Sequence, residues 1–152
     1  MSKTDDFFNA TGGKLLTFLL GEQEYGIRID HAREVVGQMA IDKVPQTPNY
    51  LMGVTNLRGK IVPVLNLRLK LGMEAVPPTG ETCIIVVSLG GAETGILVDF
   101  LVGVVTIGQA EFTEGLDLGE QIDTQFIYGM GKIDKRVIAI LEVGSLVESL
   151  DL

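Results

Sequence analysis

The chain contains an internal duplication, and this repeat constrains the possible fold more than any other feature of the sequence. The segments "LGEQEYGIRIDHAREVV" (20–36) and "LGGAETGILVDFLVGVV" (89–105) align at a constant offset of 69, with eight identities in seventeen positions, where chance gives roughly one. A weaker match at an offset of 76 places "GVTNLRGKIVPVLNL" (53–67) on "GMGKIDKRVIAILEV" (129–143). Both matches run in the same order, so the sequence predicts two copies of one folding unit.

Each copy has the pattern of a small β-structure. Short runs rich in Val, Ile, Leu and Phe are separated by Gly, Asp and Asn, as in strands joined by turns. Each copy offers about five such runs, which suits a small closed barrel better than an open sheet. Pro63 has no N–H to donate, so we expect its strand to be an edge strand or to be bulged there. Helical patterns are confined to "LRLKLG" (67–72) and "VGSLVESLDL" (143–152).

The composition is that of a globular chain with a strongly acidic second half. Of its 152 residues, 46% are apolar, which is enough to bury a core without disulfides. Residues 1–76 hold nine Lys and Arg against eight Asp and Glu, a net charge of +1, whereas residues 77–152 hold three against twelve, a net charge of −9. This acidic balance argues against nucleic acid and anionic membranes as partners, because both are bound by clustered Lys and Arg.

The sequence indicates a cytoplasmic protein with no direct membrane insertion. No apolar run approaches the roughly 20 residues that cross a bilayer, and the opening "MSKTDDFFNATGGK" (1–14) lacks the hydrophobic segment of a signal peptide. The single cysteine, Cys83, cannot form an internal disulfide, and its apolar neighbours predict a buried, inert thiol.

We find no pattern that predicts catalysis. His31 is the only histidine, which excludes a metal site that needs two imidazoles, and we expect it to face solvent. The glycine-containing segments lack the spacing of a phosphate-binding loop. We therefore expect no catalytic residue, no metal and no cofactor. The run "FLVGVVTIG" (100–108) would place apolar residues on both faces of its strand, which indicates either a partner-binding surface or burial between the two copies.

Three segments together resemble the CheW family of chemotaxis coupling proteins: "GVTNLRGKIVPVLNLRLKLG" (53–72), "LGEQEYGIRI" (20–29) and "GILVDFLVGVV" (95–105). The resemblance runs from about residue 14 to residue 150. It implies an all-β fold of two intertwined five-stranded SH3-like β-barrel subdomains packed on a shared core, with short helices including one at the C-terminus. It also implies a single CheW-like domain over 14–152, with a first barrel at about 14–72 plus the C-terminal helix, a second at about 80–143, and a flexible segment at 1–13.

The resemblance implies a non-catalytic adaptor. Such a protein couples the cytoplasmic tips of chemoreceptors, the methyl-accepting chemotaxis proteins, to the regulatory domain of the histidine kinase CheA. It is cytoplasmic and is recruited to membrane-associated receptor arrays. Since no receiver or kinase segment is present up to Leu152, a separate adaptor is favoured over CheA or CheV, which carry the same domain type. The resemblance does not distinguish an adaptor that serves flagellar motility from one that serves pilus-based or gliding motility.

The resemblance also implies two sets of binding residues, carried over by position. Arg58 would pair with Glu34, because a guanidinium can hold a carboxylate through two parallel hydrogen bonds; alternatively, Arg58 only ties two strands together. The receptor-binding groove would comprise Ile29, Ala32, Glu34, Val35, Gly53, Arg58 and Leu101, and the kinase-binding residues would be Ile41, Asp42, Lys43, Val44, Thr113 and Leu118.

A different class of function stays open at this point. The groove between the two barrels would also suit a small-ligand or sensory binding module. A deep, enclosed pocket with converging polar groups would indicate such a module, whereas a shallow, open groove would indicate the adaptor.

Overall fold

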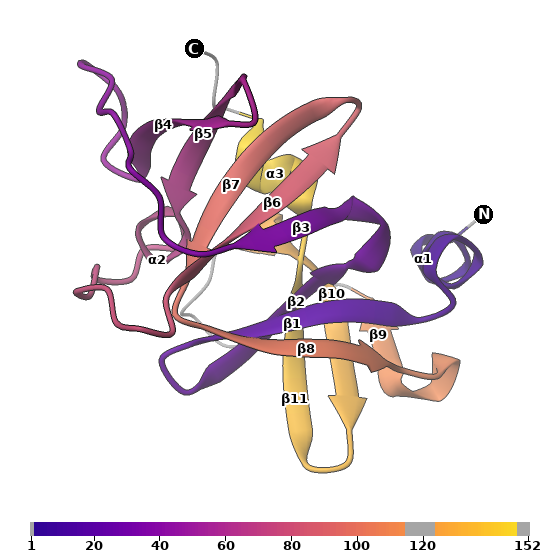
Figure 1. Ribbon diagram of the computed structural model, residues 1–152. Coiled ribbons are helices and arrows are strands. Elements are labelled where there is room, and N and C mark those ends of the chain that lie inside the picture. The colour runs from indigo at the N-terminus through magenta and orange to yellow at the C-terminus, as the bar shows by residue number, and fades with distance from the viewer. Residues whose placement is uncertain (1, 115–123, 149–152) are drawn as a thin grey trace.

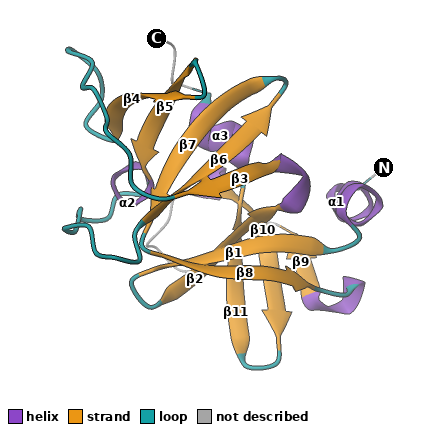
Figure 2. Cartoon of the chain, viewed as in Figure 1, coloured by secondary structure: helices purple, strands orange, loops and turns teal. Residues whose placement is uncertain are grey.

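The computed structural model describes residues 2–114 and 124–148 (Figures 1 and 2). The strands are β1 (Lys14–Leu20), β2 (Gln23–Arg28), β3 (Ala32–Val36), β4 (Leu51–Leu57), β5 (Lys60–Asn66), β6 (Cys83–Leu89), β7 (Ala92–Val98), β8 (Phe100–Thr106), β9 (Phe112–Glu114), β10 (Ile127–Ile133) and β11 (Arg136–Leu141). The helices are α1 (Lys3–Thr11), α2 (Leu67–Lys70) and α3 (Val143–Val147), with short 3-10 turns η1 (Ile29–His31), η2 (Gln109–Glu111) and η3 (Thr124–Phe126).

The strands form two sheets of matching order. Sheet A has the order β8-β1-β2-β11-β10-β9 and sheet B the order β3-β6-β7-β5-β4. The offsets of the sequence repeat make β1 to β5 equivalent to β6, β7, β8, β10 and β11. Each sheet therefore combines the first hairpin of one copy with three strands of the other, and β9 adds a sixth strand to sheet A. The all-β fold of two intertwined barrels is confirmed.

The division of the barrels along the chain differs from the prediction. The sequence assigned 14–72 to one barrel and 80–143 to the other, yet β3, β4 and β5 join β6 and β7 in sheet B, and β8 to β11 join β1 and β2 in sheet A. Parallel pairing of β2 with β11 and of β5 with β7 closes each sheet across the two copies. Equivalent strands carry the same apolar pattern, so the pattern alone does not select between partners.

One core is shared by the two sheets, as predicted. It includes Phe18 and Ile27 from sheet A and Ile85 and Ile96 from sheet B, all fully buried. Each sheet has in addition an end core of its own. The end core of sheet A contains Phe7, Leu15, Ile107, Phe112, Tyr128, Ile138 and Ile140, and that of sheet B contains Leu57, Val62, Val64, Ile84 and Val86.

The N-terminal segment is a packed helix, which corrects the expectation of a flexible segment at 1–13. The Ser2 side chain accepts a hydrogen bond from the Asp5 N–H, and Gly12 ends α1 in the left-handed conformation. Phe7 is 0% exposed, and its ring stacks on Phe112 with centroids 5.1 Å apart. The sequence reading missed the helix because its apolar face consists of little more than adjacent phenylalanines.

The short helices are confirmed at α2 and α3, which bury Leu67 and Leu146 in the shared core. The expectation for Pro63 was wrong in part, since β5 lies between β7 and β4 and is not an edge strand. Val54, opposite Pro63, uses its own N–H and C=O to bond Asp42 on its other side. Pairing of β5 with β7 starts only at Val64, so the missing N–H of Pro63 leaves no ladder bond broken.

Candidate functional site

Several of the predicted receptor-binding residues lie beside the shared core, on β3, β8 and the turn before β3. Ile29 in η1, Ala32 in β3 and Leu101 in β8 are half-buried and pack against that core, and Val35 in β3 is exposed. Strand β3 is an edge of sheet B, and its equivalent β8 is an edge of sheet A. Edge strands with accessible apolar side chains suit the binding of another protein.

Strand β8 is apolar on both faces, as predicted. Phe100, Val102 and Val104 are 41%, 42% and 57% exposed, whereas the alternating Leu101 and Val105 are half-buried. The outward face is therefore left uncovered by the described part of the chain. Of the two alternatives, a partner-binding surface fits this face, and burial against the shared core fits the inward face.

The structure brings Glu34 and Arg58 together. Arg58 occupies the turn between β4 and β5, and its Nη2 donates a hydrogen bond to Oε1 of Glu34 in β3. The bond joins one pair of atoms, where the sequence reading expected two parallel bonds. Asn56 Oδ1 accepts a hydrogen bond from the Gly59 N–H at 2.9 Å, which fixes the turn that carries Arg58. The bond from Arg58 holds the pKa of Glu34 below its ordinary value, so both groups are charged at neutral pH.

A second carboxylate extends this charged border. Glu93 in β7 lies 3.6 Å from Nε of Arg33 in β3 and 3.6 Å from Nζ of Lys60 in β5. In sheet A the equivalent pair, Glu24 and Arg136, forms a shorter bridge of 2.6 Å. The duplicated glutamate thus links strands from different copies in both sheets, and in sheet B it also holds cations beside Glu34.

Gly53 has a structural role that the sequence reading did not assign to it. It is buried in β4 with φ +141°, and a Cβ at this position would lie 2.1 Å from the carbonyl oxygen of Asp42. This close approach permits the bridge between Asp42 and Val54. Gly53 therefore supports the predicted kinase-binding segment, although it was predicted as a groove residue.

The two predicted kinase contacts lie at equivalent places in the two sheets. Asp42 pairs with Val54 beyond β4, and Thr113 in β9 pairs with Met130 in β10. Val54 and Met130 are equivalent at the offset of 76. Around Asp42, Lys43 is exposed, whereas Ile41 and Val44 are half-buried; Thr113 is exposed, and Leu118 lies outside the described residues. The sequence did not reveal this equivalence because the connecting segments differ in length.

Arg28 is a buried charge that the sequence reading missed. Its guanidinium bonds Asp30 at 2.7 Å and 3.0 Å, Asp6 of α1 at 2.7 Å, and the hydroxyl of Tyr128 at 3.2 Å. This network ties α1 to η1, the turn that carries Ile29. The sequence held one indication of this ion pair, which is the aspartate repeated at positions 30 and 99. Asp99, the equivalent of Asp30, also binds an arginine, Arg68.

His31 and Cys83 have no sign of chemical activation. Cys83 is half-buried, and burial raises the pKa of its thiol, in agreement with an inert cysteine. His31 is half-buried rather than solvent-facing, and its Nδ1 finds no hydrogen-bond partner among the described residues. Burial lowers the pKa of His31, and the nearby charge of Asp30 opposes this shift only in part.

This environment predicts a pH effect on stability. The pKa of His31 in the folded state lies below its unfolded value of about 6.5. As the pH falls, His31 is therefore protonated in the unfolded chain before it is protonated in the folded chain. The contribution of neutral His31 is present above about pH 6.5 and is lost as the pH falls toward the folded pKa. We expect wild-type protein to lose more stability than His31→Gln between about pH 7.5 and 5.5, as measured by urea denaturation. Equal losses in both proteins would contradict this expectation.

The described residues contain neither a cluster of metal ligands nor a membrane-spanning helix. No group of three or more His, Cys, Asp or Glu side chains in 2–114 and 124–148 is arranged to hold a metal ion. Within the same residues, none of the helices has the length and apolar character needed to span a bilayer.

Comparison with known proteins identifies the family. A profile of the CheW-like domain matches residues 14–151. The chain is 31% identical over 138 residues to the chemotaxis protein CheW of Klebsiella aerogenes, covering 91% of this chain and 83% of that protein. It is 32% identical over 146 residues to a probable chemotaxis protein CheW of Rhizobium etli, covering 96% and 94%.

A solved structure agrees with these sequence matches. The crystal structure of the scaffolding protein TtCheW from Thermoanaerobacter tengcongensis has a TM-score of 0.84 and 34% identity to this chain, covering 90% of this chain and 92% of that one. The relatives carry the names of chemotaxis and scaffolding proteins, which confirms the prediction of a non-enzymatic protein. The duplicated strands, the intertwined sheets and these similarities together show that the chain belongs to the CheW-like domain family.

Proposed function

We propose that this protein couples the cytoplasmic tips of chemoreceptors to the regulatory domain of the histidine kinase CheA, and that it is recruited in this way to membrane-associated receptor arrays. The observation that carries the proposal is the surface around β3 and β8. There, apolar side chains are accessible at two sheet edges, and β3 also carries Glu34 of the Glu34–Arg58 ion pair. A helical receptor tip would bury the apolar side chains, and the ion pair would fix its position.

The kinase would bind away from the receptor, at the outer edges of the sheets. The main contact is proposed at Ile41 to Val44 and a second one at Thr113, with Leu118 nearby in sequence. The equivalence of Asp42 and Thr113 in the repeat supports this arrangement, because each of the two sheets then offers one of two related segments for contact with a kinase domain. A protein with two such contacts can link separate kinase molecules.

The alternative of a ligand-binding module between the barrels has less support. The pocket lined by Gln38 and Asn66 lies at the end of sheet B rather than between the sheets. The amide of Gln38 already donates to the Thr79 carbonyl at 3.0 Å, and Asn66 Oδ1 accepts from the Leu69 N–H at 3.2 Å. These polar groups are engaged within the protein and do not converge on a ligand.

A binding titration tests the proposal. Purified protein would be titrated separately with a receptor cytoplasmic hairpin and with the CheA regulatory domain from the same genome, and then with both together. Binding of both at once, at separate sites, is the expected result. Failure to bind either partner would remove the adaptor function and leave only the fold.

The charge asymmetry predicts different salt dependences at the two sites. Residues 77–152 carry a net charge of −9, so a contact made by this half through exposed charges weakens as salt rises from about 0.05 to 0.5 M, because the Debye length shortens. Receptor binding at the apolar groove changes little over the same range. Calorimetric titrations at several salt concentrations measure both, and a salt-independent contact at Thr113 would contradict the prediction.

A further inference from the structure

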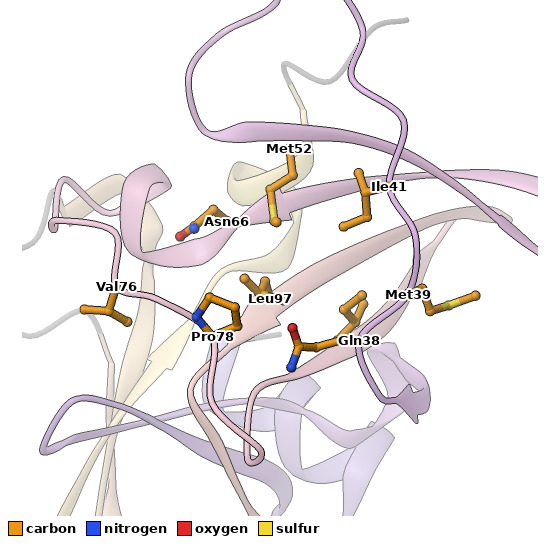
Figure 3. A pocket seen from close by; sticks show the side chains of 9 residues that line it. Gln38, Met39, Ile41, Met52, Asn66, Val76, Pro78 and Leu97 are labelled. Atoms are coloured by element: carbon orange, nitrogen blue, oxygen red, sulfur yellow. The ribbon is translucent and has the colours of Figure 1, made fainter.

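A pocket of about 150 Å³ opens at the end of sheet B. The residues that line it include Gln38, Ile41, Met52, Pro78, Ile84 and Leu97, which come from β4, β6 and β7 and from the segments before β4 and before β6. Figure 3 shows Met52, Leu97 and Pro78 facing one another around the open space. Most of the lining is apolar, and two of the side chains are flexible methionines, which adapt readily to a guest.

The sequence repeat shows what fills the corresponding place in sheet A. At the offsets of 69 and 76, Ile84 and Met52 are equivalent to Leu15 and Tyr128. Since Asp42 and Thr113 occupy matching positions in the bridges to Val54 and Met130, Ile41 is equivalent to Phe112. These three equivalents, Leu15, Phe112 and Tyr128, belong to the end core of sheet A.

In sheet A the same place is occupied by a phenylalanine carried on a helix. The Phe7 ring lies 5.1 Å from the ring of Phe112 and 6.2 Å from that of Tyr128, and its side chain is fully buried. Helix α1, which presents Phe7, precedes the residues that match the family profile. In the described residues, sheet B has an open pocket where sheet A has Phe7.

We propose that the pocket at the end of sheet B is a binding site for a phenylalanine-sized apolar side chain of the CheA regulatory domain, held as α1 holds Phe7 in sheet A. Ile41 belongs both to the pocket and to the proposed main kinase contact, so the inference rests on that part of the proposed function. A dry apolar cavity of about 150 Å³ accepts a benzene-sized guest, and the pocket has this volume. A side chain anchored in such a pocket is the usual source of a binding hot spot.

Benzene is the first probe, because it tests the pocket without any partner. Protein with ¹³C-labelled isoleucine and methionine methyl groups would be titrated with benzene and followed by NMR. The methyl signals of Ile41, Ile84 and Met52 are expected to shift together, whereas those of Ile138 and Met130 in sheet A stay in place. Absence of any shift at the pocket would overturn the inference and leave the adaptor function intact.

The kinase then serves as a competitor on the wild-type protein. Saturating CheA regulatory domain is expected to abolish the benzene-induced shifts, whereas the receptor hairpin leaves them unchanged. Kinase binding that leaves the benzene shifts in place would show that no kinase side chain enters the pocket. If the kinase domain does not bind wild-type protein at all, the proposed kinase contact fails and the inference fails with it, whereas absent benzene shifts alone overturn only the inference.

A filled-pocket variant adds a quantitative test. Leu97→Phe places a larger side chain in the pocket, and we expect it to weaken binding of the kinase domain by about tenfold or more while receptor binding changes by less than about twofold. Val137→Phe, at an exposed position of β11 in sheet A, is the matched control and should change neither affinity. Unchanged kinase binding by a folded Leu97→Phe protein would overturn the inference.

Discussion

Replacing Phe7 by alanine is expected to reduce the free energy of unfolding by about 3–5 kcal/mol, the usual range for removing a large buried aromatic side chain. Phe7 is 0% exposed and packs against the rings of Phe112 and Tyr128 in the end core of sheet A. Its removal leaves a cavity that rigid strands cannot fill. Urea denaturation gives the change in stability, and hydrogen exchange should show faster exchange of the amides of α1 and β9.

Phe8→Ala is the matched control for this prediction. Phe8 belongs to the same helix but is only half-buried, so the same chemical change should cost clearly less. Both variants keep Asp6, whose bond to Arg28 holds α1 to η1. Equal and small effects of the two substitutions would instead support a loosely attached segment at 1–13.

Reversing the charge at position 58 with Arg58→Glu is expected to weaken receptor binding by more than about tenfold. The introduced carboxylate would lie beside Glu34 of the same chain, and repulsion between the two like charges would push both side chains out of the positions that we propose for contact with the receptor. Arg58→Ala should have a smaller effect of the same sign. Arg58 is 69% exposed in its side chain, so neither variant should unfold the protein. Titration with the receptor hairpin measures the affinity, and thermal denaturation measures the stability.

The double variant Glu34→Arg with Arg58→Glu tests whether the pair acts as a unit. Restoring opposite charges should recover a large part of the affinity lost in Arg58→Glu, as a double-mutant cycle would show. Kinase binding should be unchanged in all of these variants. A parallel loss of thermal stability and receptor binding in Arg58→Ala would make the role of Arg58 structural, the alternative left open by the sequence.

Two parts of the site could be predicted before the structure. The pairing of Glu34 with Arg58 was implied by the resemblance to the CheW family and is present, and the turn of "NLRG" (56–59) places Arg58 at the tip of a hairpin. The apolar faces of β8 were predicted from a run with no alternation. The binding roles of these residues stay predictions until partner titrations are made.

Other parts depend on contacts between residues far apart in the chain. The bonds of Arg28 to Asp6 and Tyr128 span 22 and 100 residues, and no local pattern indicates them. The pocket at the end of sheet B is open because no side chain of the described residues fills it, whereas Phe7 of α1 fills the equivalent place in sheet A. Gly53 was assigned to the groove by position, whereas its backbone conformation serves the bridge to Asp42.

The sequence by itself determined the duplicated unit, the all-β class, the short helices α2 and α3 and the absence of catalytic patterning, because each of these depends on spacing and composition along a short stretch of chain. Only the tertiary structure decided which hairpin joins which three strands, where α1 packs and which sheet end stays open. The two copies carry the same apolar alternation, so local signals are equal for both pairings. The choice between them depends on the burial of side chains across the whole molecule.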